Sequence, residues 1–171
     1  MIQISERNEF VDNRLDFEEC SCINTSKYMY DIEGNLFISH ITDFLRNYNH
    51  FPMKVVHTLV KDMSDSDYDN KAHKFKIESI HSIEELNHIL DEVGWKLING
   101  KFFITDSINP ITFTTYEFNL EKKKITAQKP LFELGNNETL IEAINHGYEF
   151  LLATNSDKLS TKEHVQKLLL T

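Results

Sequence analysis

The chain has 171 residues, of which 40% are hydrophobic, and this length is typical of one domain. Only 5 Gly and 3 Pro are present, which excludes a collagen-like, linker-like or generally disordered chain. The formal net charge is −9, from 27 acidic and 18 basic residues, and a field of that sign repels nucleic acids and acidic membranes and attracts basic proteins.

The negative charge is concentrated in the N-terminal part. Residues 1–70 hold 13 acidic and 6 basic residues, a difference of −7, whereas residues 71–171 hold 14 and 12, a difference of −2. The first 34 residues show no clear periodicity. We therefore predict a single globular domain over 1–171 with an irregular acidic N-terminal segment over 1–34.

The N-terminus and the cysteines bear on the compartment. Met1 to Arg7 lacks a basic stretch followed by an apolar one, so no signal peptide is expected, and no apolar run approaches the ~20 residues of a membrane helix. Cys20 and Cys22 are too close for an unstrained disulfide, and a structural metal site would need two more ligands. We expect a soluble protein of a reducing cytoplasm that uses no cofactor and no metal.

The next segments predict a helix and a strand. From Asn35, a residue suited to cap a helix, apolar residues recur at steps of three and four through Tyr48. The β-branched residues between Met53 and Val60 favour a strand, with a helix as the alternative.

An acidic segment over residues 62–70 follows. Asp65, Asp67 and Asp69 match positions 1, 3 and 5 of a calcium-binding loop, but Asn70 stands where Gly is expected and Lys76 where a closing Glu is expected. This segment is therefore predicted to be a solvated acidic loop without a metal.

The middle of the chain alternates between strand and helix signals. Phe75 and Ile77 alternate with charged residues and predict a half-buried strand, and Ser82 and Glu85 match a capping box that opens a helix ending at Gly94. Asn99-Gly100 favours a tight hairpin turn between strands at 95–98 and 101–104. Two further strands, at 111–118 and 124–128, complete a predicted meander.

The C-terminal part returns to helix in this prediction. Leu140, Ile141, Ile144, Tyr148 and Leu151 are spaced for one helical face, and Ser160 with Glu163 form a second capping box. The predicted fold class is α+β, with an antiparallel sheet of four to six strands (a β-meander) packed against helices on one side.

No catalytic motif is present. The sequence contains no Gly-rich phosphate loop, no Gly-x-Ser-x-Gly and no His-Glu-x-x-His. Asp106 followed by Glu121-Lys122-Lys123 imitates the residues of a metal-dependent nuclease, but the second group falls in a predicted hairpin turn. We therefore expect a protein that is not an enzyme.

Carboxylates interspersed with tyrosines are the remaining functional signal. Such a surface pairs with Lys and Arg and still anchors a partner through its aromatic rings. The predicted partner-binding residues are Asp62, Asp65, Asp67, Tyr68, Asp69, Glu18, Glu19 and Tyr30.

A small acidic α+β chain without catalytic motifs has the general profile of bacterial immunity proteins, which neutralise a cognate and often basic nuclease toxin. The hypothesis is therefore a cytoplasmic toxin inhibitor that acts through protein–protein interaction. The alternative is a cryptic enzyme or small-ligand binder with a pocket between sheet and helices, lined by Trp95, Phe102, Phe113 and Tyr116. The oligomeric state does not follow from the sequence.

Overall fold

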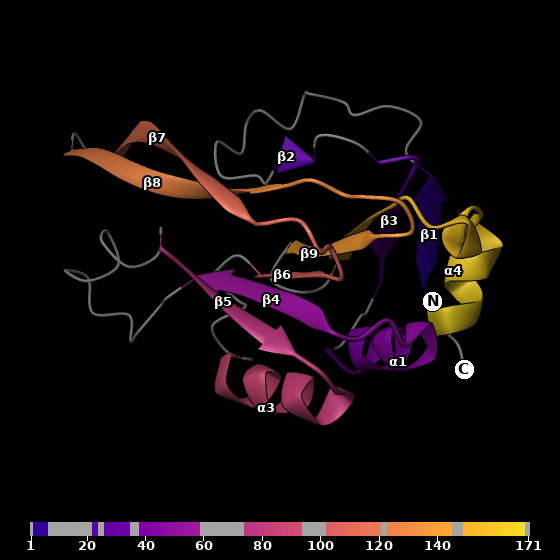
Figure 1. Cartoon of the computed structure of the whole chain (residues 1–171). Helices are drawn as coiled ribbons and strands as arrows, with labels where there is room; N and C mark the ends of the chain where they lie inside the picture. Colours follow the sequence, from indigo (N-terminus) through magenta and orange to yellow (C-terminus); the bar gives the residue numbers. More distant parts are fainter. Residues whose placement is uncertain are drawn as a thin grey trace.

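The computed structural model describes residues 2–6, 22–23, 26–34, 38–58, 74–93, 102–120, 123–144 and 149–169. In chain order, the elements are β1 (Gln3–Glu6), β2 (Cys22–Ile23), β3 (Tyr28–Glu33), α1 (Ile38–Tyr48), β4 (Met53–Thr58), β5 (Phe75–Ile80), α3 (Ile83–Val93), β6 (Phe102–Thr105), β7 (Thr112–Leu120), β8 (Lys123–Phe132), β9 (Thr139–Ile144), β10 (Glu149–Thr154), the 3-10 helix η4 (Asp157–Leu159) and α4 (Lys162–Leu169). Figure 1 shows helices on one face of the main sheet and a second, smaller sheet on the other.

The main sheet has seven strands in the order β1-β3-β10-β9-β6-β4-β5. Every neighbouring pair in it is antiparallel. The predicted α+β class and the antiparallel sheet are therefore confirmed, and the sheet is larger than the four to six strands expected.

The second sheet has three strands in the order β2-β8-β7. Its main part is the long β7–β8 hairpin, whose register runs from Thr112 opposite Leu131 to Leu120 opposite Lys123. The short β2 strand adds to β8 in parallel. The predicted hairpin between 111–118 and 124–128 is thus confirmed, although it belongs to a separate sheet.

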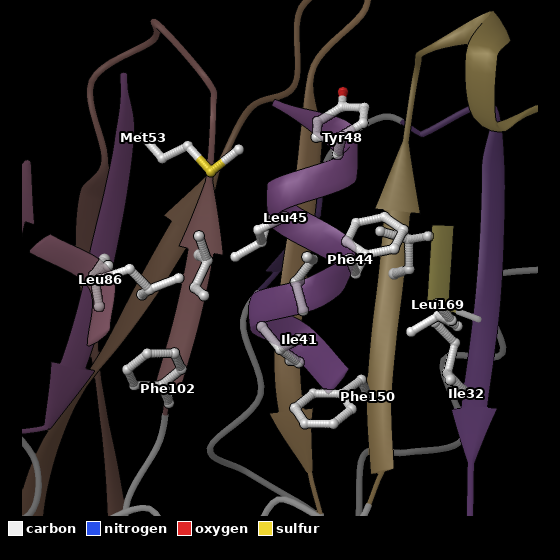
Figure 2. Close-up of a cluster of buried hydrophobic side chains, with 14 of the residues drawn as sticks. Ile32, Ile41, Phe44, Leu45, Tyr48, Met53, Leu86, Phe102, Phe150 and Leu169 are labelled. Atoms are coloured by element: carbon white, nitrogen blue, oxygen red, sulfur yellow. The ribbon is translucent and has the colours of Figure 1, made fainter. Parts of the chain in front are cut away.

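One hydrophobic core lies between the main sheet and the helices. Alternate residues of each strand point to this face, so that Ile32, Phe150 and Phe102 meet Phe44 and Leu45 of α1. Figure 2 shows α1 lying over these strands with its apolar side chains turned toward them. α3 contributes Leu86 and α4 contributes Val165 and Leu169 to the same cluster. All three described α-helices therefore contribute to the same core.

A second core lies on the opposite face of the main sheet. Phe103 and Val56 of the sheet are 0% exposed there and pack with Phe132 of β8. The rings of Phe103 and Phe132 have their centroids 5.2 Å apart. The central strands of the sheet are therefore buried on both faces.

The helix predicted over Leu140 to Leu151 is wrong. Thr139–Ile144 and Glu149–Thr154 are the strands β9 and β10, which pair with each other across a short connection. Both lie inside the main sheet and are covered on both faces, and such strands read as continuous apolar runs rather than alternating ones. An apolar run of this kind cannot be told from a buried helix by its periodicity alone.

The predicted meander is also wrong at its first hairpin. Residues 95–98, the expected partner of β6, lie outside the described residues. Over Phe102–Thr105, however, β6 is bordered by β4 on one edge and β9 on the other. Both edges of β6 are therefore occupied over Phe102–Thr105, and neither is free to pair with a strand at 95–98.

The two predicted capping boxes have different outcomes. At α3, the backbone N–H of Glu85 donates to Ser82 Oγ at 3.3 Å, and Glu85 Oε2 accepts from the backbone N–H of His81 at 2.7 Å. At α4, the capping residue is Thr161 rather than Ser160, because Thr161 Oγ1 accepts from the backbone N–H of His164 at 3.3 Å. Ser160 instead ends the preceding 3-10 helix.

Candidate functional site

Most of the predicted partner-binding residues lie outside the described residues. This holds for Glu18 and Glu19 in the N-terminal segment and for the whole acidic segment, namely Asp62, Asp65, Asp67, Tyr68 and Asp69. Their predicted role therefore stays a prediction, and the structure locates it only through the elements that flank them.

Tyr30 is a correction to the predicted surface. Its side chain is 1% exposed and lies in the core between the main sheet and the helices. Its hydroxyl donates a hydrogen bond to the Leu159 carbonyl oxygen at 2.7 Å. Burial, assisted by the charge of Glu6, raises the pKa of Tyr30 to about 12. This hydrogen bond links β3 to η4, and the buried ring of Tyr30 is not accessible to a partner.

The strands that flank the acidic segment lie at an edge of the main sheet. β4 ends at Thr58 and β5 begins at Phe75, and these two residues face each other in the antiparallel register. β5 is the last strand on this side of the sheet. The described parts of the chain before and after residues 59–73 therefore meet at a single place, the outer end of the β4–β5 pair.

Helix α3 adds exposed carboxylates beside this edge. Its apolar residues Leu86, Ile89 and Leu90 are buried against the sheet, and α3 lies along β5 in Figure 1. The outward face of α3 carries four exposed acidic residues and no Lys or Arg, namely Glu84, Glu85, Asp91 and Glu92. We call the β4–β5 end together with these α3 carboxylates the acidic edge.

A charged network joins β4 to β5 under the acidic edge. His57 is 7% exposed, and its Nε2 lies 2.9 Å from Glu78 Oε1. Glu78 Oε2 in turn accepts from Lys76 Nζ at 2.7 Å. Burial alone would raise the pKa of Glu78, but the hydrogen bonds from Lys76 and His57 outweigh it and the pKa is lowered. Glu78 is therefore held as a carboxylate, which fixes the two strands where the acidic segment begins.

A second polar cluster lies elsewhere, where α1 ends. Asp106 follows β6, and its side chain is 6% exposed. Its Oδ2 lies 3.2 Å from both the Tyr48 hydroxyl and His50 Nδ1, while its Oδ1 accepts from the backbone N–H of Thr139 at 2.5 Å. Figure 2 shows the Tyr48 hydroxyl pointing away from the apolar cluster at the end of α1.

Burial dominates the electrostatics of this cluster. It raises the pKa of Asp106, against the lowering effect of hydrogen bonds from Thr139, His50 and Tyr48. Burial and the nearby charge of Asp106 also raise the pKa of Tyr48. Tyr48 therefore stays a neutral donor to Asp106 or Thr139, whose Oγ1 is 2.9 Å from the Tyr48 hydroxyl.

Sequence reasoning missed this cluster because its members are far apart in the chain and form no motif. Asp106 was considered only with Glu121-Lys122-Lys123, and it is instead engaged by Tyr48, His50 and Thr139. The available signal was the position of polar residues at strand ends, since Asp106 directly follows β6 and Thr139 opens β9.

The side chains proposed to line a sheet–helix pocket do not share one surface. Phe102 is 3% exposed in the core under the helices. Phe113 stacks on Phe75, with ring centroids 5.8 Å apart, and Phe75 packs against the core on the other face of the sheet. Tyr116 is half-buried on β7, and Trp95 lies outside the described residues.

Comparison with models of known protein families, with curated proteins and with solved structures finds no match to this chain. Among the described residues, no group of three or more His, Cys, Asp or Glu side chains is placed to hold a metal ion. Within the same residues, no helix combines the length and apolar character needed to span a membrane.

Proposed function

We propose that this chain is an acidic binding protein of the immunity type, which neutralises a basic protein partner such as a bacterial nuclease toxin in the cytoplasm. In this proposal it acts by binding and not by catalysis. The acidic edge is the binding surface, and the acidic segment over residues 62–70 provides its central contacts.

The observation that carries the proposal is the pairing of Thr58 with Phe75. It joins the strands that flank the acidic segment at one edge of the sheet, and α3, which packs along β5, carries exposed carboxylates. Carboxylates that share one edge act on an approaching partner together, because their potentials add over a Debye length of about 8 Å at physiological salt.

Electrostatic steering is the physical advantage of such a surface. Complementary charge can raise the association rate constant from the neutral ~10⁵–10⁶ M⁻¹s⁻¹ to as much as ~10⁸–10⁹ M⁻¹s⁻¹ at low salt. A rapid encounter suits an inhibitor, because the toxin is neutralised before it reaches its substrate. The charged network of His57, Glu78 and Lys76 supports this role by linking β4 to β5, the two strands that flank the acidic segment.

The proposal is tested by capture of partners from the native host. Three baits are compared at low and high salt: the wild-type chain, a chain with Asp62, Asp65, Asp67 and Asp69 all changed to Lys, and a control with Glu6, Glu33, Glu133 and Glu163 all changed to Lys. Both variants change the net charge by the same amount, and the control positions are exposed and lie outside the acidic edge.

We expect one stoichiometric basic protein to bind the wild-type and control baits and to be lost from the bait reversed in the acidic segment. Equal loss from both variants would show that only net charge matters. If no bait captures a basic protein, the proposal is wrong, and the small-ligand alternative becomes the better account.

A further inference from the structure

The cluster around Asp106 contains one group that its internal contacts do not explain, the outer nitrogen of His50. The His50 ring stacks on the Tyr48 ring, with centroids 4.3 Å apart, and its side chain is 28% exposed. Its Nδ1 faces inward to Asp106, and its Nε2 lies 3.4 Å from Lys158 Nζ, on the η4 turn. Two nitrogen-bearing side chains from distant parts of the chain thus meet at the surface.

Asp106 determines which His50 nitrogen carries the proton. A carboxylate only accepts hydrogen bonds, so the 3.2 Å contact between His50 Nδ1 and Asp106 Oδ2 requires the proton on Nδ1. In the neutral ring, Nε2 then holds a lone pair and accepts from the Lys158 ammonium group.

His50 is not needed to satisfy Asp106. The carboxylate already accepts from the backbone N–H of Thr139 and lies within hydrogen-bond distance of the Tyr48 hydroxyl. His50 and Lys158 have the features of a preorganised binding site. The His50 ring stacks on Tyr48, is oriented by the buried Asp106 carboxylate and lies next to the Lys158 ammonium group.

We propose that His50 and Lys158 bind a tetrahedral oxyanion of the phosphate or sulfate class, and that binding is coupled to protonation of His50. Without the anion, two positive charges 3.4 Å apart would repel each other, so the ring stays neutral and accepts from Lys158. An anion seated on both groups removes that repulsion. The ring takes up a proton on Nε2. His50 Nε2 and Lys158 Nζ then each donate a charge-assisted hydrogen bond to the anion.

The charged groups that face this site are few among the described residues. From α1 and the turn after it come Tyr48 and His50, from the turn after β6 comes Asp106, and from η4 comes Lys158. The neighbouring Asp157 is directed elsewhere, because its Oδ1 is 3.9 Å from Lys27 Nζ and 3.5 Å from the Tyr28 hydroxyl. The proposal assigns the coupled proton to His50, the ring that contacts both Asp106 and Lys158.

The experiment is a sulfate titration of the full chain, followed by NMR through the backbone amide resonances of residues 49–51 and 157–159, which every variant retains. Sulfate has the same charge at about pH 6 and about pH 8, so only the protein titrates between the two conditions, and chloride keeps the ionic strength constant. Lys158→Gln and His50→Gln are compared with Lys162→Gln and His164→Gln. The control residues are exposed members of α4.

We expect saturable binding that is about tenfold weaker at the higher pH, since the neutral ring loses one charge-assisted hydrogen bond. Lys158→Gln should weaken binding by a similar factor, and His50→Gln should abolish the pH dependence, while both controls behave as wild type. The inference is overturned if the shifts do not saturate, if affinity is equal at both pH values, or if Lys158→Gln and Lys162→Gln behave alike.

A second arm replaces sulfate by inorganic phosphate and by a phosphoserine dipeptide at one pH. Binding of both with equal affinity assigns the site to a free anion, whereas tighter binding of the dipeptide assigns it to a phosphorylated chain. Both outcomes support the site, because each requires saturable binding that Lys158→Gln weakens. Failure of this inference would leave the acidic edge untouched, since the two surfaces share no residue.

Discussion

Thr58 and Phe75 face each other across the last two strands of the main sheet. The pairing joins the two strands that flank the acidic segment at one edge of the sheet. The neighbouring helix α3 has an outer face that carries carboxylates and no Lys or Arg. The proposed function depends on this edge, and the stability of the fold depends on the two cores on either face of the main sheet.

The second sheet is predicted to stabilise the main sheet by covering its other face. Phe132 of β8 is 1% exposed and packs on Phe103. Phe132→Ala should lower the free energy of unfolding by about 3–5 kcal/mol, because it removes a buried aromatic ring and leaves a cavity. Urea denaturation measures this value. Ile108→Ala, at a residue that is 86% exposed, is the control and should change stability by less than about 0.5 kcal/mol; equal effects would contradict the second core.

The network under the acidic edge predicts a dependence of stability on acid pH. The pKa of Glu78 is lowered in the folded state from its ordinary value of 4.5, so its contribution to stability is present above that value and is lost as the pH falls through the folded-state pKa. Glu78→Gln should therefore destabilise the protein at neutral pH, by about 1–3 kcal/mol for hydrogen bonds to a charged group.

The difference between wild type and Glu78→Gln should shrink as the pH falls well below 4.5. Denaturant unfolding at a series of pH values measures it, and Glu133→Gln, at an exposed residue, is the matched control. A difference that stays constant with pH would mean that the ionised carboxylate of Glu78 contributes nothing specific.

The raised pKa of the buried Tyr30 hydroxyl leads us to expect a loss of stability at alkaline pH. Its pKa is raised to about 12 from 10.0, so the folded state retains a proton that the unfolded state releases above pH 10. The corresponding stability is complete below the unfolded-state pKa and is lost as the pH rises toward 12. Tyr30→Phe should therefore show a smaller fall in the free energy of unfolding between about pH 9 and about pH 11 than the wild type. Identical slopes for the two proteins would refute the buried position of this hydroxyl.

The helices were predictable from the sequence because each lies at the surface with one buried face. The apolar residues of α1 and α3 recur with the helical period, and the cap of α3 forms as its sequence indicates. β9 and β10 were not predictable in the same way. Leu140-Ile141 and Phe150-Leu151-Leu152 are buried on both faces of the sheet, so no alternation marks them as strands.

The acidic segment and the cluster around Asp106 also differ in how far the sequence predicts them. The acidic segment is continuous in sequence, so its charge could be recognised, but its place at the sheet edge depends on the β4–β5 register. The cluster of Tyr48, His50 and Asp106 is assembled by long-range contacts between two separate segments, the end of α1 and the turn after β6, and no local sequence pattern predicts it. Tyr30 was assigned to the surface because neighbouring carboxylates suggested exposure, whereas β3 lies between β1 and β10 with this ring turned to the helices.

The most direct test of the proposed function is the association rate constant of the captured basic partner, measured by stopped flow at several salt concentrations. Reversal of Asp91 and Glu92 to Lys is the informative variant, because positive charge in the last turn of a helix does not disfavour the helix itself. Glu6 and Glu133, both exposed and outside the acidic edge, are reversed as the control pair. We expect the wild-type rate constant to fall steeply with salt and the α3 variant to associate about tenfold more slowly at low salt, with the control pair close to wild type. Equal rate constants for the two variants, or a wild-type rate constant that does not change with salt, would contradict the acidic edge as the binding surface.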